Sequence, residues 1–484
     1  MAKHSYKTNI LYNSIYRCVV ILTPLITSPY LARVLGAEKL GIYSYANAFA
    51  TYFVIFSLLG VNDYGNRTIA QARGDRNALS DRFWQIYYLQ LFLTVILLAA
   101  YLITIFVAAK YFTVQLVFAI YVFSSALEVN WFAFGLEEFK LTSIRSIITR
   151  LGIVAGIFLF VRSENDLWKY ALITTLGNVI SLIIILPLVK KYTDFRKPEL
   201  KKILSHVKPN LILFLPVIAT SVYQQLSKLM LSAWSTEAEV GFFQNAENIV
   251  TLPTFITTAI VTVMLPYASN LVASGEHDKN RMMLHSFLKY TSILNLAMSF
   301  GMLAIAKDFI PWYLGSAFER SAELLMIMAP MIFLSGCGSI LRYQYLIPNE
   351  YDRANLISMF AGAGVDILLN LLFIGKFGAA GSAVAVVAAY FVTLVIQLLY
   401  AKRELDLRAM LLELLPYAGF GAVMFGAVRA VSSLPIPTLL RILAELAAGG
   451  VIFVACSALW MKHTGDPILA NFAEALCGRL RKRK

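Results

Sequence analysis

Across 484 residues the chain is 59% hydrophobic and only 14% charged, with a mean hydropathy of +0.68. A soluble fold is excluded, because an ordinary soluble domain carries roughly 25% charged residues to cover its surface. The net charge of +14 lies in short loops beside apolar runs and in the terminal Arg-Leu-Arg-Lys-Arg-Lys. This pattern indicates membrane topology and argues against nucleic acid as a partner.

A helix needs about 20 mostly apolar residues to cross roughly 30 Å of hydrocarbon. Fourteen stretches of the chain meet this requirement, and they lack the period-two alternation of barrel strands. The predicted spans lie near residues 9–33, 40–62, 84–108, 111–131, 144–161, 168–189, 210–232, 243–268, 283–306, 322–346, 354–375, 379–401, 411–431 and 438–460. The chain is therefore predicted to be an all-α polytopic membrane protein.

The distribution of Lys and Arg predicts how these spans are oriented. Of the 42 basic residues, 28 fall in loops on the same side as the N-terminus, 10 fall on the opposite side and four lie within helices. Because cytoplasmic loops retain basic residues, both termini are predicted to be cytoplasmic. Residues 467–478 carry apolar side chains at helical spacing before the basic end, which predicts an interfacial helix on anionic membrane lipids.

The domain prediction rests on the longest connection near the middle of the chain. Residues 191–208 form a cytoplasmic linker between an N-lobe over 1–190 and a C-lobe over 209–402, with six helices each, and 403–484 supply the last helix pair and a basic amphipathic tail. A shift of 200 residues aligns Gly41 with Gly241. An even number of helices per half makes the repeats parallel, so two rocking lobes around a central cavity are expected.

Enzymatic chemistry finds little support in the sequence. No GxxxxGK[ST] or GxGxxG run occurs, and the four cysteines show no metal-ligand spacing. All five histidines fall in predicted cytoplasmic loops or at cytoplasmic helix ends. A polymerase or ligase acting at the outer face would need a base there, which disfavours that class.

Polar residues inside the spans predict a cavity. Asn13 and Arg17 share one face of the first helix, and other polar residues follow helices 2, 5, 7 and 8. Charged residues in a span are costly unless they face protein or water, so they mark a pathway. The candidate substrate-binding residues are Asn13, Arg17, Asn47, Arg150, Gln224, Gln225, Lys228, Asn245 and Asn248. Arg17 and Lys228 could contact a diphosphate; the alternatives are a structural contact between helices for Arg17 and snorkelling for Lys228.

Several motifs resemble the Wzx-type polysaccharide flippases of the multidrug/oligosaccharidyl-lipid/polysaccharide exporter superfamily. They are Pro24 to Tyr43 with Arg33-Val-Leu-Gly36, Tyr64-Gly-Asn-Arg67, Asn130-Trp131-Phe-Ala-Phe-Gly135 and Phe377-Gly378-Ala-Ala-Gly381. The resemblance implies fourteen helices and outward movement of undecaprenyl-diphosphate-linked glycans. It also implies O-antigen, capsule or exopolysaccharide synthesis, no cofactor, a bacterial inner-membrane location, and polysaccharide polymerase and chain-length machinery as partners.

Asp366 departs from the pattern that this resemblance implies, since a neutral residue, usually Asn, is expected there. With Asn370 one turn further along the same face, Asp366 is a candidate for H⁺ or Na⁺ coupling. A neutral, hydrogen-bonded Asp between helices is the alternative. For the whole chain, the alternative function is a multidrug or other lipid exporter of the same superfamily, which a more anionic cavity would favour.

Overall fold

A computed structural model describes residues 6–402 and 404–466, with side chains for residues 19, 22–262, 264–402 and 404–466. Every regular element in these residues is helical, which confirms the predicted all-α polytopic class. The interfacial helix predicted for residues 467–478 lies outside the described residues. By their internal contacts the residues divide into two compact units: unit 1 comprises 1–248 and 359–385, and unit 2 comprises 249–358 and 386–484.

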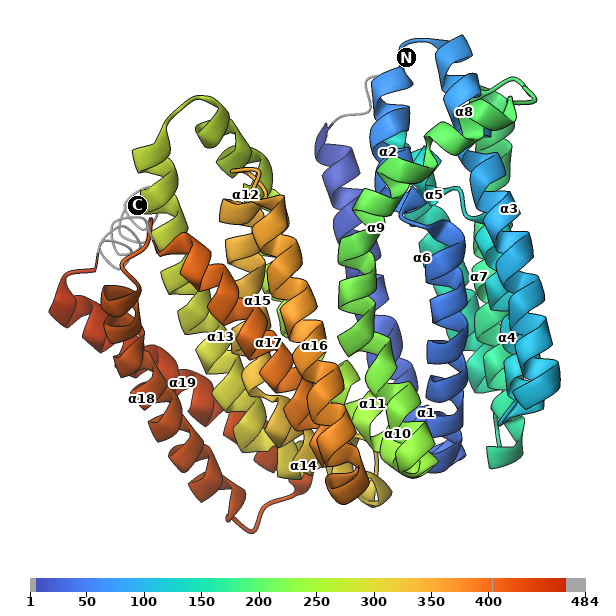
Figure 1. The fold of residues 1–484 in the computed structure, drawn as a ribbon. Coiled ribbons are helices and arrows are strands. Elements are labelled where there is room, and N and C mark those ends of the chain that lie inside the picture. The colour runs from blue at the N-terminus through green and yellow to red at the C-terminus, as the bar shows by residue number, and fades with distance from the viewer. Residues whose placement is uncertain (1–5, 403, 467–484) are drawn as a thin grey trace, which may run out of the picture. The chain divides into compact units, whose positions relative to one another are not determined.

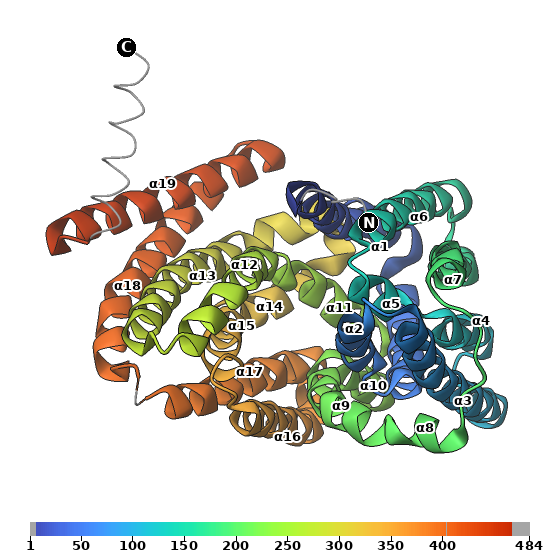
Figure 2. The same ribbon diagram turned by 90° about the horizontal axis from the view of Figure 1, so that it is seen from above.

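The helices follow one another with short connections (Figures 1 and 2). The first eleven are α1 (Tyr6–Leu58), α2 (Val61–Ala72), α3 (Arg76–Ala108), α4 (Phe112–Ser124), α5 (Asn130–Gly135), α6 (Phe139–Phe160), α7 (Leu167–Tyr192), α8 (Leu200–Ser205), α9 (Val207–Ser221), α10 (Ser227–Trp234) and α11 (Glu237–Thr251). The remainder are α12 (Thr254–Ala273), α13 (His277–Tyr313), α14 (Glu319–Met328), α15 (Pro330–Ile340), α16 (Asp352–Phe377), α17 (Ala379–Ala401), α18 (Leu407–Ser432) and α19 (Thr438–Thr464). Two π-helical segments, Val222–Leu226 and Leu341–Leu346, interrupt the regular helices.

Among the described residues, twelve helices are long and apolar enough to cross a membrane, and a pair bent by 44° over Ser316–Met328 and Pro330–Leu346 gives a thirteenth. The difference from the fourteen predicted spans has a local cause. The first two predicted spans join into α1, which continues through Gly36 with a backbone φ of 73°. This conformation is open to glycine and strained for other residues, so the helical axis turns without an intervening loop.

Two glycines allow helices of unit 1 to approach at backbone distance. A Cβ atom on Gly41 would lie 1.7 Å from the Glu237 carbonyl oxygen, and one on Gly241 would lie 2.0 Å from the Ala37 carbonyl oxygen. The same two glycines align in sequence at the 200-residue shift. Gly41 therefore packs against the beginning of α11, and Gly241 packs against Ala37, just after the kink of α1. No residue with a Cβ can make this reciprocal contact.

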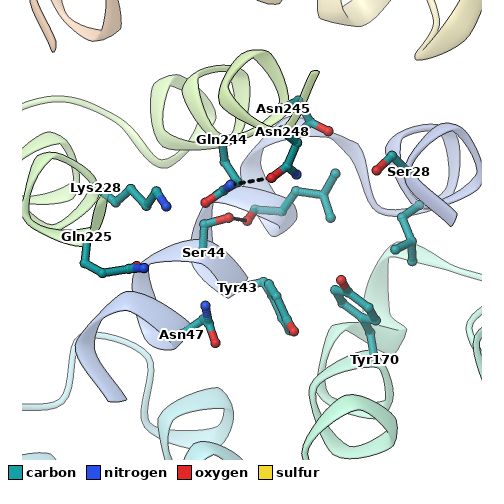
Figure 3. A pocket seen from close by; sticks show the side chains of 12 residues that line it. Ser28, Tyr43, Ser44, Asn47, Tyr170, Gln225, Lys228, Gln244, Asn245 and Asn248 are labelled. Atoms are coloured by element: carbon teal, nitrogen blue, oxygen red, sulfur yellow. Dashed lines mark hydrogen bonds between the residues drawn. The ribbon is translucent and has the colours of Figure 1, made fainter. Parts of the chain in front are cut away.

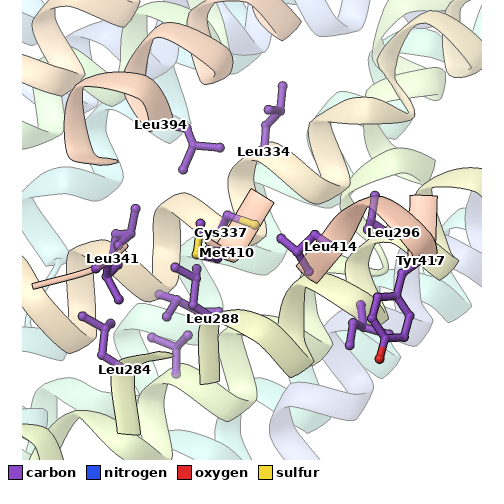
Figure 4. Close-up of a cluster of buried hydrophobic side chains, with 14 of the residues drawn as sticks. Leu284, Leu288, Leu296, Leu334, Cys337, Leu341, Leu394, Met410, Leu414 and Tyr417 are labelled. Atoms are coloured by element: carbon purple, nitrogen blue, oxygen red, sulfur yellow. The ribbon is translucent and has the colours of Figure 1, made fainter. Parts of the chain in front are cut away.

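Each unit has its own apolar core. In unit 1, Phe83, Trp131 and Phe132 are almost completely buried where α3 and α5 meet, and Phe83 stacks on Trp131 with ring centroids 5.4 Å apart. In unit 2, the core joins α13, α15, α17 and α18 through residues such as Leu288 and Leu414 (Figure 4). These cores fix the helices from which the polar side chains described below project.

Candidate functional site

A polar cavity of about 320 Å³ lies inside unit 1 (Figure 3). Its walls come from α1, α7, α10, α11 and the π-helical segment Val222–Leu226. The lining residues are Ser28, Leu31, Leu40, Tyr43, Ser44, Asn47, Tyr170, Gln225, Lys228, Gln244, Asn245 and Asn248. Amide and hydroxyl groups dominate this list, although the surrounding helices are apolar.

Local helix geometry places these groups together. The π-helical turn at Val222–Leu226 widens the helix between α9 and α10, and Gln225 and Lys228 both reach the cavity from this region. Gln244 and Asn248 are four residues apart on α11 and therefore share one face. The close contact at Gly41 and Gly241 brings α1 and α11 near enough to form opposite walls.

Among the described lining residues, Lys228 alone is cationic, and its charge has a partner. Its Nζ lies 2.9 Å from Oε2 of Glu247, and the side chains are 6% and 12% exposed. Snorkelling of Lys228 toward the membrane surface is therefore not what the structure shows. Since one buried charge is matched by one opposite charge, the pair is electrically neutral.

The amide side chains offer both donors and acceptors to a ligand. Gln244 Nε2 donates to Asn248 Oδ1 at 2.8 Å, and Asn245 Nδ2 donates to the Gly241 carbonyl at 2.9 Å. Gln225 Oε1 is buried and accepts no hydrogen bond within the described part of the protein. Such a lining matches a ligand with many hydroxyl groups, because each hydroxyl both donates and accepts.

A second polar cluster of unit 1 surrounds Asp366, which is completely buried. Ser227 Oγ donates to Asp366 Oδ2 at 3.2 Å, and Asn370 Nδ2 donates to the Asp366 carbonyl oxygen at 2.9 Å. Ser382 Oγ in turn donates to Asn370 Oδ1 at 2.6 Å. Asp366 Oδ1 has no hydrogen-bond partner among the described residues. A buried carboxylate is costly without neutralisation, so this oxygen needs a proton or a cation.

A cluster of ionic and hydrogen-bonded groups surrounds the start of α11 in unit 1. Lys110, in the connection between α3 and α4, forms an ion pair with Glu237 at the start of α11. Tyr111 and Ser232 donate hydrogen bonds to the same carboxylate, at 2.7 and 2.8 Å. Glu239 accepts a 2.7 Å hydrogen bond from the backbone N–H of Ala379 at the start of α17. The carboxylates of Glu237 and Glu239 thus link the start of α11 to the α3–α4 connection and to the start of α17.

The structure brings five of the predicted binding residues to one cavity: Asn47, Gln225, Lys228, Asn245 and Asn248. Gln224 is exposed and lies outside the lining. Arg150 lies half-buried on α6, also outside the lining. Asn13 and Arg17 belong to α1, but their side chains lie outside the described residues. Asp366 and Asn370 contact each other as described above.

Five other polar or aromatic lining residues were absent from the predicted set: Ser28, Tyr43, Ser44, Tyr170 and Gln244. Ser28 and Gln244 lie on the polar stripes of helices 1 and 8 that the sequence displays, so their spacing could have identified them. Tyr170 stands alone in an apolar helix and gives no such signal. It reaches the cavity by stacking on Tyr43, with ring centroids 4.3 Å apart.

The long apolar helices define the chain as a multi-pass membrane protein, and the buried polar cavity is of the kind that transporters use. Residues 6–272, more than half of the chain, match the family described as "Polysaccharide biosynthesis protein". The chain belongs to this family. The resemblance to polysaccharide flippases seen in the sequence is thereby confirmed.

Two relatives support this assignment. A protein of Escherichia coli (strain K12) named for O-antigen transport is 24% identical over 83% of this chain and 98% of its own length. A Haloferax volcanii protein named as the low-salt glycan biosynthesis flippase Agl15 is 24% identical over 54% of each chain.

Two solved structures share the fold. The lipid II flippase MurJ in an inward closed conformation has a TM-score of 0.77 at 13% identity, covering 94% of this chain and 99% of that one. An inward-facing multidrug resistance transporter of the MATE family in the MOP superfamily has a TM-score of 0.65 at 14% identity, covering 83% and 98%. The relatives are transporters and flippases, and this chain is a transporter.

Proposed function

We propose that the chain is a flippase for undecaprenyl-diphosphate-linked oligosaccharide repeat units, moving them from the inner to the outer leaflet of the bacterial plasma membrane. The observation that carries the proposal is the amide-rich cavity with Lys228 inside an apolar bundle. Amides suit the hydroxyl groups of a glycan, and a lysine suits a diphosphate. The names of the O-antigen and glycan-flippase relatives agree with this substrate class.

The proposed architecture has fourteen crossings, two six-helix lobes in parallel repeat and a final helix pair, with both termini cytoplasmic. Alternating access between the lobes then carries the headgroup across. One of the thirteen candidate spans contains most of α1. If the two parts of α1 on either side of Gly36 count as separate crossings, the thirteen become fourteen. The product would supply surface polysaccharide synthesis, such as O-antigen, capsule or exopolysaccharide, together with polymerase and chain-length machinery.

Within the cavity, we infer that the diphosphate displaces Glu247 from Lys228. The ion pair keeps Lys228 charged in the empty carrier, and the incoming anion replaces one partner by another without stranding a buried charge. Asn47, Gln225, Asn245 and Asn248 then hydrogen-bond the first sugars. Asn13 and Arg17, on the polar face of the first helix, would extend the binding surface, and Arg150 and Gln224 would act outside the lining.

An exporter of cationic drugs or of another lipid is the second candidate from the same superfamily. A cation exporter needs an excess of negative charge in its cavity. Within the described residues, the lining includes Lys228 and no carboxylate, and the Glu247 carboxylate just outside the lining is matched by Lys228. The cavity therefore lacks the excess of negative charge that a cation exporter needs. A membrane polymerase or ligase is a weaker alternative still, because it would need a base at the outer face and all five histidines fall in predicted cytoplasmic loops or helix ends.

Energy coupling follows from the charge of the substrate. A diphosphate with about two negative charges gains roughly 2.3 kcal/mol per charge per 100 mV when it moves outward in an inside-negative membrane. Uniport is therefore thermodynamically possible. The buried Asp366, with one unpartnered oxygen and Asn370 beside it, supports a second source of energy, uptake of H⁺ or Na⁺.

Reconstitution tests the function directly. Full-length protein in vesicles with an undecaprenyl-diphosphate oligosaccharide should expose the glycan to an external lectin much faster than protein-free vesicles do. A membrane potential that drives the anion outward should increase the rate. Transport of a cationic dye in the same vesicles, without movement of the glycan lipid, would establish the drug exporter instead.

A further inference from the structure

A second cavity of unit 1, about 510 Å³ in volume, lies between α2, α3 and α9. Arg67 and Arg82 line one side with His206, and Pro209, Ile212 and Leu213 line the other. These residues flank the loops richest in Lys and Arg, and none of them belongs to the amide-rich cavity. The site is therefore separate from the one assigned to the glycan.

The polar side of this cavity carries uncompensated positive charge. No carboxylate lines it within the described residues, and Arg67 forms no ion pair there. Arg82 Nη1 donates only to the Thr68 carbonyl, at 3.2 Å, so most of its donors remain available. A guanidinium group binds phosphate with two parallel hydrogen bonds, and two of them on one wall define an anion site.

His206 holds this wall in place. Its Nε2 lies 2.9 Å from Gln85 Oε1 on α3, and its Nδ1 lies 2.7 Å from the Tyr64 hydroxyl on α2. The imidazole thus connects the two helices that carry Arg82 and Arg67. Both ring nitrogens are already engaged, so His206 positions the arginines and leaves anion binding to them.

The opposite side of the cavity is apolar and continues to the surface of the bundle. Ile212 is 56% exposed, and neighbouring Leu211 is 44% exposed. In a helix long and apolar enough to span a membrane, such side chains face lipid tails. A free phosphate ion gains nothing from this wall. A lipid, with a charged headgroup and an apolar chain, fits both sides.

We propose that this cavity binds the phosphate headgroup of a membrane lipid, with Arg67 and Arg82 on the phosphate and the α9 face along the first part of the chain. The binding site does not depend on the proposed function, because it needs only a phosphate lipid at the membrane surface. Two sources share this chemistry: an anionic glycerophospholipid, or a polyprenyl diphosphate before it enters the amide-rich cavity.

Native mass spectrometry of the full chain released from vesicles tests the site. One set of vesicles contains phosphatidylcholine and phosphatidylglycerol in equal amounts, and in the other undecaprenyl diphosphate replaces part of the phosphatidylglycerol. Arg67→Ala and Arg82→Ala should each lower retention of the anionic lipid at least about tenfold, the size expected for a lost charge-assisted contact. Arg67→Lys should retain part of the binding. Lys201→Ala, which removes an exposed charge on α8 outside the cavity, should change nothing.

Preferential retention of phosphatidylglycerol would identify a phospholipid site, and preferential retention of undecaprenyl diphosphate would identify a substrate-entry site. Retention that is equal in the native chain, Arg67→Ala and a charge-reversed Arg67→Glu chain would overturn the proposal. Arg82→Ala could disturb α3, so circular dichroism and thermal melting of each variant accompany the measurement. Failure of glycan translocation with intact lipid retention would count against the proposed function alone.

Discussion

Lys228 in unit 1 and Lys289 in unit 2 are both lysines inside long apolar helices, yet their surroundings differ. Lys228 has one carboxylate partner, Glu247, and faces a cavity lined with amides. Lys289 lies between two carboxylates, with Nζ 2.9 Å from Asp466 Oδ2 and 3.6 Å from Glu413 Oε2. Tyr290 also donates to Asp466, at 2.6 Å.

We interpret the difference as that between the proposed binding site and a structural contact. The Lys289 cluster joins α13 to α18 and to the end of α19, and its charges are neutralised by protein groups alone. The Lys228 pair has an open cavity beside it, so a ligand can replace one partner. A cation within a span therefore indicates transport only when its neighbourhood leaves room for the transported group.

The largest loss of glycan-lipid transport should follow from replacing both Lys228 and Glu247. Lys228→Met with Glu247→Gln removes two opposite charges together, so no buried charge is left alone and the protein should fold. Translocation of the glycan lipid should fall by about a hundredfold, as expected for one strong charge-assisted contact. The rate of lectin exposure in reconstituted vesicles measures this loss.

The matched control is Lys289→Met with Asp466→Asn in unit 2, which removes one lysine and one buried carboxylate away from the cavity. It leaves Glu413, whose side chain is 40% exposed, in place. It should retain most of the translocation rate. Equal loss of transport in both double variants would mean that buried pairs matter only for the fold.

Asp366→Asn should have the next largest effect. The asparagine keeps the size of the side chain and can still accept from Ser227, so folding should be preserved. If Asp366 takes up a cation, the response of transport to collapse of the proton or sodium gradient should disappear. Transport that keeps both its rate and its response would leave Asp366 a structural role only.

Lys289→Met alone should lower the free energy of unfolding. The substitution removes the ammonium group that lies 2.9 Å from Asp466 Oδ2, and the Asp466 side chain is only 2% exposed. We expect a loss of about 2 to 4 kcal/mol in the free energy of unfolding. Adding Asp466→Asn should restore most of it. Thermal unfolding in detergent measures both, and a single variant as stable as the native chain would contradict the structural role.

The smallest expected effect is that of pH on the Arg76–Asp194 contact in the linker after α7. Arg76 donates two hydrogen bonds to Asp194, at 2.9 and 2.8 Å, and it holds the pKa of that carboxyl below its usual range. The contact should stay intact from neutral pH down through the ordinary carboxylate range, and it should weaken only as pH falls through the lowered pKa. The protection factors of the backbone amides of residues 193–199, which compare each exchange rate with its intrinsic rate at the same pH, should be constant between pH 5 and 8. A marked loss of protection at pH 5 would be inconsistent with this pairing.

Sequence alone predicted the helices well, because length and hydropathy determine which segments cross a membrane. It also identified Asn47, Gln225 and Lys228, since polar residues at helical spacing are costly in lipid. The pairing of Lys228 with Glu247 was not predictable, because it depends on the turn between α10 and α11 and on a π-helical segment. The reciprocal packing of Gly41 and Gly241 likewise was not predictable, because it depends on how α1 and α11 approach each other. Only the alignment of the two glycines at the 200-residue shift could be seen in the sequence.

Photo-crosslinking from within the cavity tests whether the glycan lipid enters it during transport. A photoreactive residue replaces Asn47, which lines the cavity, or Leu368, which is 55% exposed on α16 and serves as the control. In vesicles containing the glycan lipid, illumination should attach that lipid to position 47 and leave position 368 labelled at most by bulk phospholipid. Equal attachment at both positions, or none at position 47 in a variant that still translocates the glycan, would contradict the account.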